Sequence, residues 1–249
     1  EEVKTFVEQV YIPDICAIGA LYADWLPYGA GVTNYLSVPE FPTDTRGTQF
    51  DMPGGVIVDK DIQGFRPISS FEDPLFRDNV AECIAHSWYN GDWTRHPWEE
   101  ETVPAYADFN PDGKYSWVKA PRFEGRPTQV GPLAHVLAGF AAGDELTKKW
   151  VTAALDTISA VAKTRVGPGA LHSTLGRHAA RAVRCAIMAE LALKHWDMLV
   201  NNIASGDVAI FTPFEFPQGE QQGFGFHEAP RGTLSHWVVI RDGKIVNYQ

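Results

Sequence analysis

The stretch from Ser173 to Ala204 constrains the fold more than any other part of this 249-residue chain. It opens with Ser173 and Thr174, both good N-cap residues, carries apolar side chains at helical spacing, and stops at Ser205-Gly206. At about 1.5 Å per residue, a helix of this length extends roughly 45 Å. Such an element predicts a helical bundle that it spans, because its apolar stripe has to be covered by other helices.

Further helices are predicted near the start of the chain and in its second half. Residues 3–25 carry apolar side chains at helical spacing, and residues 144–165 combine this spacing with an acidic first turn and Gly167-Pro168-Gly169 after the end. A weaker helical period covers residues 71–88. It begins after Glu72-Asp73-Pro74, where the proline suits a first helical turn.

β-strands are predicted in two short segments. Residues 54–60 follow a Gly-rich turn, and Asp242-Gly243 supplies the turn of a hairpin near residues 236–248. Residues 89–132 are dense in Pro, Gly and aromatic residues, which indicates an ordered loop packed over a scaffold. These patterns predict an α+β fold in one domain over residues 1–249, dominated by a long-helix bundle with small peripheral β-hairpins and long ordered loops. The helical pattern at the first residues and the hairpin at the last ones lead us to expect a segment of a longer protein.

Composition narrows the classes of function. The chain is 45% apolar with a formal net charge of −10, which argues against a nucleic-acid partner and against a polybasic membrane-surface protein. No window approaches the roughly 18 consecutive apolar residues of a membrane span, and no leader peptide is predicted. Cys16, Cys83 and Cys185 are far apart, so neither a disulfide framework nor a zinc site is expected, and buried thiols are the preferred interpretation.

Common catalytic signatures do not occur in the sequence. There is no P-loop, GxSxG, HExxH or dinucleotide-binding fingerprint, and the eight histidines form no metal-binding pair. Arg177, Arg181 and Arg184 share one face of the longest predicted helix. They could contact an anion or a partner, but the favoured interpretation is a polar face satisfied by Asp and Glu of neighbouring segments.

The most informative stretch runs from Gly223 to Trp237. Glycines on both sides of Pro230-Arg231 allow close backbone approach, and Pro230 fixes its own φ and restricts Ala229. The pattern therefore presents Arg231 from a stiffened turn at the head of a strand. A fixed cation with five donors suits an anionic ligand or the electrostatic support of a reaction centre, and from the residues alone a structural arginine is an equal alternative.

The same stretch, Gly-Phe-Gly-Phe-His-Glu-Ala-Pro-Arg-Gly-Thr-Leu-Ser-His-Trp, closely resembles a motif of the large, catalytic subunit of nickel-iron uptake hydrogenases. The resemblance covers essentially all 249 residues, and this length is about the middle half of a typical large subunit. Further family landmarks follow in the expected order: His86-Ser-Trp-Tyr89, Tyr115-Ser-Trp-Val-Lys-Ala-Pro-Arg122, Val130-Gly-Pro-Leu-Ala134, Ser173-Thr-Leu-Gly-Arg177 and Ile240-Arg-Asp-Gly-Lys-Ile245.

The resemblance implies a nickel-iron centre with cyanide and carbon monoxide on the iron, held by four cysteines in two CxxC pairs, and a magnesium ion. Neither pair is present, so the two cysteine-bearing ends of the family are expected to be missing and no metal ligand is assigned to Cys16, Cys83 or Cys185. The carbonyl that helps to hold the family's magnesium comes from just past Gln249. This segment alone is therefore not expected to bind the centre or to be active.

The resemblance assigns a catalytic role to two residues. Arg231 matches the family's arginine over the open coordination site between nickel and iron, and Pro230 matches its neighbour in the pocket wall. Reversible oxidation of H2 separates a proton from a hydride, and a nearby cation can stabilise that separation. Electrostatic support is the first hypothesis for Arg231 and a general base the second, because arginine is a poor base in water.

The resemblance also implies partners and a location. Electrons are expected to leave through an iron-sulfur small subunit and from there to a membrane cytochrome b. The expected location is the periplasm, with membrane association through the partner. The alternative is a metal-free helical scaffold or electron-transfer subunit of the same fold, like the related subunit of respiratory NADH dehydrogenase. An unrelated aromatic-rich binding module would explain the loops but not the order of the motifs.

Overall fold

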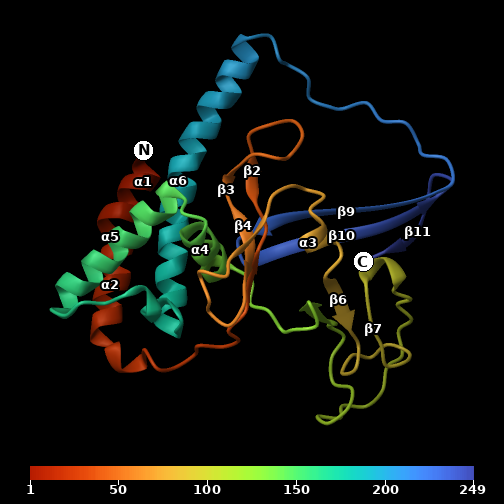
Figure 1. The fold of residues 1–249 in the computed structure, drawn as a ribbon, viewed down its shortest axis with the longest axis horizontal. Helices are drawn as coiled ribbons and strands as arrows, with labels where there is room; N and C mark the ends of the chain where they lie inside the picture. Colours follow the sequence, from red (N-terminus) through yellow and green to blue (C-terminus); the bar gives the residue numbers. More distant parts are fainter.

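The computed structural model describes residues 1–249, with helices gathered on one side and antiparallel sheets on the other (Figure 1). The sheets have the strand orders β1-β4-β5, β2-β3, β7-β6-β8 and β11-β10-β9. This mixed architecture confirms the predicted α+β class. None of the helices is both long enough and apolar enough to span a membrane.

The first helical region is continuous from Glu2 to Leu21. It consists of α1 (Glu2–Phe6), a π-helical segment η1 (Val7–Tyr11) and α2 (Ile12–Leu21), and the short 3-10 helix η2 (Ala23–Trp25) follows. The wider π-helical turn lies just before Pro13, which has no N–H to donate to the helix ladder. The predicted helix over residues 3–25 is thus confirmed.

The two long predicted helices are α5 (Glu145–Ala162) and α6 (Thr174–Ala204). Each begins with a side-chain cap: Asp144 accepts from the Thr147 N–H at 2.7 Å, and Ser173 accepts from the Gly176 N–H at 3.0 Å. Together with α2 and α4 (Pro132–Ala141) they enclose a core of 20 buried residues.

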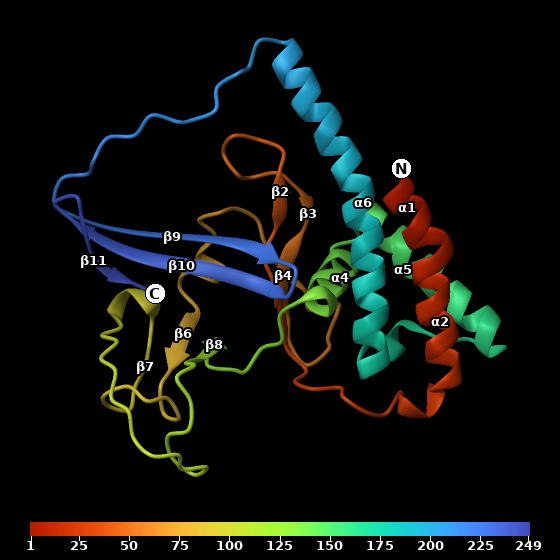
Figure 2. The ribbon, with the colours of Figure 1, turned by 180° about the vertical axis from the view of Figure 1, so that it is seen from behind.

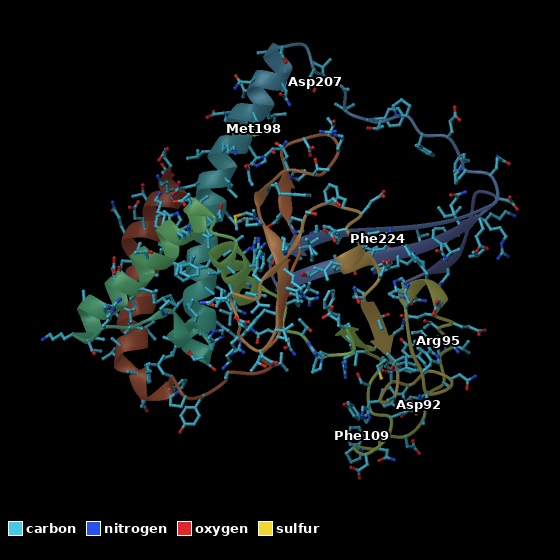
Figure 3. The ribbon with its side chains drawn as sticks, viewed as in Figure 1. Asp92, Arg95, Phe109, Met198, Asp207 and Phe224 are labelled. Carbon is cyan, nitrogen blue, oxygen red and sulfur yellow. The ribbon has the colours of Figure 1, made fainter.

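The predicted dominance of a long-helix bundle is not confirmed. The buried side chains of α6 end at Leu191, and beyond it the helix projects past its neighbours, with Trp196 65% exposed (Figure 1). Its projecting end carries Met198, and an exposed connection over residues 205–219 leads on to β9 (Figure 3). The helix is therefore longer than the bundle that it joins.

Sheets form the other part of the molecule. Their strands are β1 (Tyr35–Ser37), β2 (Glu40–Pro42), β3 (Phe50–Met52), β4 (Gly54–Ile57), β5 (Arg66–Ile68), β6 (Val80–Cys83), β7 (Thr94–Arg95), β8 (Ala120–Phe123), β9 (Glu220–Ala229), β10 (Gly232–Arg241) and β11 (Lys244–Tyr248). The 3-10 helices η3 (Pro97–Glu99) and η4 (Pro168–Leu171) lie in the connections.

Both predicted β regions are confirmed in position, since β4 lies within 54–60 and the β10–β11 hairpin turns at Asp242-Gly243. The hairpins are larger and more central than predicted, because β9 and β10 have ten residues each. Phe226 of β9 and Trp237 of β10 belong to a second core of eight buried residues, built around Phe76. The strands therefore contribute a core of their own.

The predicted helix over residues 71–88 is wrong beyond its first turn. Only α3 (Pro74–Arg77) forms, capped by Asp73, and residues 80–83 become β6. β6 pairs with β8 on one side and β7 on the other, so its backbone groups find partners in two strands. This pairing outweighs a weak helical period.

Candidate active site

Pro230 and Arg231 form the two-residue turn that joins β9 to β10. The strands pair up to the turn itself, with Ala229 opposite Gly232. Both turn residues are exposed. Arg231 takes no part in the molecule's ion pairs, whereas Arg184, close behind the turn, takes part in two. The structure thus presents Arg231 from a tight hairpin turn, as the sequence pattern predicts.

The turn packs against the N-terminus of α4 at two glycines (Figure 2). At Gly131, the residue before α4, φ is +111°, and an added Cβ would lie 2.8 Å from the backbone oxygen of Arg231. At Gly232, φ is +143°, and an added Cβ would lie 2.6 Å from Val130 Cγ2. Any other residue at either position would push the turn away from α4.

Close backbone approach on both sides of Pro230-Arg231 is confirmed only in part. Gly232, after the turn, makes the predicted close contact. Before the turn, a Cβ on Gly225 would meet nothing within 4 Å, and one on Gly223 would make an ordinary 3.6 Å contact with Val238. The partner that requires a glycine is instead Gly131, which is distant in sequence.

A buried polar cluster lies directly behind the turn. Arg184 of α6 donates through Nη1 to the carbonyl of Ala229 at 3.3 Å, and through Nη2 to the carbonyl of Glu228 at 3.1 Å. Its Nη2 also donates to Glu40 Oε2 at 3.1 Å, and its Nη1 lies 3.8 Å from Glu228 Oε1. Arg184 therefore binds both the backbone and the acidic side chains next to the turn.

Glu228 is almost fully buried at the end of β9. Its Oε2 accepts hydrogen bonds from the Val38 N–H at 3.1 Å and from Thr233 Oγ1 at 2.9 Å. Burial, with the neighbouring charge of Glu40 as a smaller contribution, raises the pKa of Glu228 to about 7 against the lowering effects of these hydrogen bonds and Arg184. Burial also raises the pKa of Glu40. Two carboxyl groups thus share one guanidinium.

His135 of α4 completes the cluster. It is fully buried, its Nε2 lies 3.9 Å from Glu40 Oε2, and neither ring nitrogen has a hydrogen-bond partner. Burial, with the nearby Arg184 as a second cause, lowers the pKa of His135 to about 3. The ring is therefore neutral at pH 7, and its contact with Glu40 is not an ion pair.

The three arginines on the face of α6 have different surroundings. Arg184 points into the buried cluster and is satisfied by Glu40 and Glu228, as the favoured interpretation predicts. Arg177 instead donates to the carbonyls of Gly29 and Ala30 and to Gln129 Oε1. Arg181 is exposed, and its Nη1 lies 3.4 Å from the Arg177 carbonyl.

A second polar cluster was not expected from the sequence. Lys119, within the motif over residues 115–122, donates to Glu82 Oε2 at 3.0 Å, to Glu100 Oε2 and to Gln249 Oε1 at 2.5 Å. Burial raises the pKa of Glu100 to about 7, and the two carboxylates keep the pKa of Lys119 above its ordinary value. This cluster joins that motif to the last residue of the chain.

The residues of this chain do not fit a nickel-iron centre by themselves. No group of three or more His, Cys, Asp or Glu side chains is placed to hold a metal ion. Cys16 is buried, Cys83 is partly buried and Cys185 is exposed, and all three are free thiols. The prediction of three buried thiols is therefore confirmed only for Cys16.

Comparison with known proteins defines the family to which this chain belongs. The family model of nickel-dependent hydrogenases matches residues 1–249. The chain is 44% identical over 250 residues to the hydrogenase-2 large chain of Escherichia coli K12, covering 100% of this chain and 44% of that protein. It is 37% identical over 271 residues to the uptake hydrogenase large subunit of Bradyrhizobium diazoefficiens, covering 98% of this chain and 43% of that protein.

Solved structures agree with these sequence matches. A reduced, active nickel-iron-selenium hydrogenase from Desulfomicrobium baculatum superposes with a TM-score of 0.75 at 29% identity, covering 100% of this chain and 47% of that one. The as-isolated oxidised nickel-iron-selenium hydrogenase from Desulfovibrio vulgaris Hildenborough gives a TM-score of 0.72 at 30% identity, covering 100% of this chain and 48% of that one. This chain belongs to the nickel-dependent hydrogenase family, and it spans about half the length of the relatives it matches.

Proposed function

We propose that this chain is the central segment of the catalytic large subunit of a nickel-iron uptake hydrogenase, which oxidises H2 reversibly to protons and electrons. The observation that carries the proposal is the Pro230–Arg231 turn, fixed against α4 by Gly131 and Gly232 in a chain of this family. Because the backbone that carries this cation is held in place, the turn need not rearrange when charge develops at a reaction centre beside it.

The reaction centre itself requires groups beyond these 249 residues. We propose a nickel-iron centre with cyanide and carbon monoxide on the iron, and a magnesium ion, all bound through residues of the family's length that this chain does not span. The centre would supply the site of H2 activation. The residues described here would supply the pocket wall through Pro230 and the fixed cation through Arg231.

Electrostatic support is the role that we propose for Arg231. Splitting H2 into a proton and a hydride separates charge. Arg231 is exposed in this segment, and its guanidinium would stabilise that separation more once the rest of the enzyme excludes water around it than it would in water. Pro230 contributes by restricting the turn that carries Arg231. A role of Arg231 as the proton acceptor is the second hypothesis, because it requires a much more acidic guanidinium than is usual.

Electron transfer would run to an iron-sulfur small subunit and then to a membrane cytochrome b, in the periplasm. Exposed apolar side chains support burial of this chain in a larger assembly. They occur on the first helical region, at the end of α6 and on the 205–219 connection, and they include Phe6, Leu21, Trp196, Ile203 and Ile210.

The alternative, a metal-free scaffold of the same fold, explains the helices but not the turn. A scaffold has no need for an arginine on a turn that two glycines hold in place. A nickel and iron analysis of the natural protein distinguishes the catalytic subunit from the metal-free scaffold. We expect a mass above 27.6 kDa, about one nickel per chain, and H2 uptake with an artificial electron acceptor. A 27.6 kDa protein without nickel and without H2 uptake would establish the scaffold instead.

A further inference from the structure

Arg184 makes contacts that a core residue kept only for stability does not need. It lies in the middle of α6, where the neighbouring buried residues Ala182, Val183 and Ala186 are apolar. Burying a guanidinium costs a large desolvation free energy, which is recovered only when the partners are well placed. Its partners here are two carboxyl groups and two backbone carbonyls, all from β2 or the end of β9.

The two backbone contacts lie at a particular place in the chain. The carbonyls that Arg184 binds belong to Glu228 and Ala229, the two residues directly before Pro230. Because the guanidinium is planar and rigid, donation from two of its nitrogens fixes the direction as well as the position of this backbone. The strand therefore enters the turn with its orientation set by α6.

Glu228 binds β10, the strand that leaves the turn. It lies opposite Thr233 in the β9–β10 register and accepts from the Thr233 hydroxyl at 2.9 Å. The same oxygen accepts from the Val38 N–H, in the segment between β1 and β2. Arg184 and Glu228 together thus attach both strands that flank Pro230-Arg231 to the rest of the molecule.

We infer that Arg184 is a positioning residue for Arg231: it holds the backbone entering the Pro230–Arg231 turn, with Glu228 as the link to the strand that leaves it. This inference rests on the proposed function of Arg231. Arg184 contacts the backbone behind the turn, so it acts through the placement of Arg231 and not on the substrate. A small displacement of a group beside a reaction centre can reduce the rate by a large factor.

The test uses the purified full-length enzyme with Arg184→Lys, which keeps the charge but loses the planar fork. Arg181→Lys is the matched control, because Arg181 lies one helical turn away on α6 and is exposed. We expect Arg184→Lys to retain its nickel and iron, to exchange the backbone amides of residues 228, 229 and 231–233 faster, and to lose about tenfold or more in kcat with a smaller change in KM for H2. Arg181→Lys should change none of these. Unchanged amide exchange in Arg184→Lys would overturn the inference.

A double-mutant cycle with Arg231→Lys shows whether Arg184 acts through Arg231. We expect the double variant to be no slower than Arg231→Lys alone, because a misplaced turn matters little once its guanidinium is gone. Losses that multiply would overturn the inference, since Arg184 would then act by another route. Should Arg231→Lys keep full turnover while Arg184→Lys still loosens residues 228–233, the role of Arg231 fails and the hold of Arg184 on the turn stands. Glu228→Gln serves as a second variant should Arg184→Lys fold poorly. It keeps a carbonyl acceptor for Val38 and Thr233 but removes the charge that lies 3.8 Å from Arg184 Nη1, so it should speed exchange of the same amides.

Discussion

Gly131 and Arg231, 100 residues apart in sequence, are packed so closely that a Cβ on Gly131 would lie 2.8 Å from the Arg231 backbone oxygen. The contact joins the N-cap residue of α4 to the β9–β10 hairpin, and so joins the helical side of the molecule to the sheets. Two stretches that resemble family motifs, 130–134 and 223–237, thereby form one site.

The other close contact of the turn, that of Gly232 with Val130 and Gly131, predicts that Gly232→Ala destabilises the protein. The new Cβ would lie 2.6 Å from Val130 Cγ2 and 2.9 Å from the Gly131 nitrogen, at a φ of +143° that alanine rarely adopts. We expect a loss of roughly 1–3 kcal/mol in the free energy of unfolding. Denaturant unfolding of the purified protein measures it.

Gly225→Ala is the control for this prediction. Gly225 lies in β9, and an added Cβ would meet nothing within 4 Å. We therefore expect little change in its unfolding free energy, because no clash arises and an alanine in a strand restricts the unfolded chain. Equal losses in both variants would show that the close contact at Gly232 is not what matters.

A second prediction concerns the pH dependence of stability. The unfolded Glu228 carboxyl loses its proton near its ordinary pKa of 4.5, whereas the folded one keeps it up to about 7. The stability that this group contributes is therefore complete below pH 4.5 and is lost as the pH rises to about 7, by about 3 kcal/mol. Glu228→Gln cannot ionise, so we expect its unfolding free energy to fall less between pH 5 and 8.

Other ionisable groups near Glu228 also contribute to the pH dependence of the unfolding free energy. Arg184 from α6 and Glu40 from β2 face it, and His135 from α4 lies beside Glu40. His135 has the opposite effect, since its lowered pKa makes stability fall as the pH drops below about 6.5. Wild type and variant share the effect of His135, so their difference reports Glu228 together with its coupling to Glu40. Parallel pH curves would contradict the buried-carboxyl account, and the exposed Glu145→Gln provides the reference.

A third prediction concerns the lobe over residues 84–118, where Asp92, Arg95 and Phe109 are labelled in Figure 3. Lys114 Nζ donates to the carbonyls of Ser87 and Tyr89 at 2.7 Å and of Gly91 at 3.0 Å. Lys114→Met leaves these carbonyls without their shared donor. We expect faster amide exchange at Trp88 and Tyr115, whose N–H groups donate hydrogen bonds across this lobe.

Lys148→Met is the control for this prediction, because it removes only an exposed ion pair and should leave amide exchange unchanged. Similar exchange in both variants would refute the role of Lys114.

Much of the fold was predictable because its long helices have a clear amphipathic period and good caps. The bounds of α5 and α6 follow Asp144, Ser173 and Gly206 closely. By contrast, α4 was not predicted; it begins at residue 132, the last residue of the expected loop, and lies before the next expected helix. Its residues from Pro132 to Gly139 are all buried, so it lacks the solvent-facing polar side of a surface helix, and His135 is the one polar residue among them.

Only those parts of the site that depend on neighbouring residues in the sequence could be predicted. The turn at Pro230-Arg231 could be found from its local motif, because proline and glycine constrain the backbone directly. The inward orientation of Arg184 could not be found, since it depends on β2 and β9 meeting α6 in space. The same holds for Gly131, whose close approach to Arg231 only the folded chain creates.

The most direct test of the account is Arg231→Lys in the full-length enzyme. Lysine keeps one positive charge but loses the rigid guanidinium that the turn presents. We expect nickel and iron content equal to wild type and H2 oxidation lower by about a hundredfold or more, with Arg181→Lys fully active. Unchanged H2 turnover at equal metal content would contradict the role of Arg231.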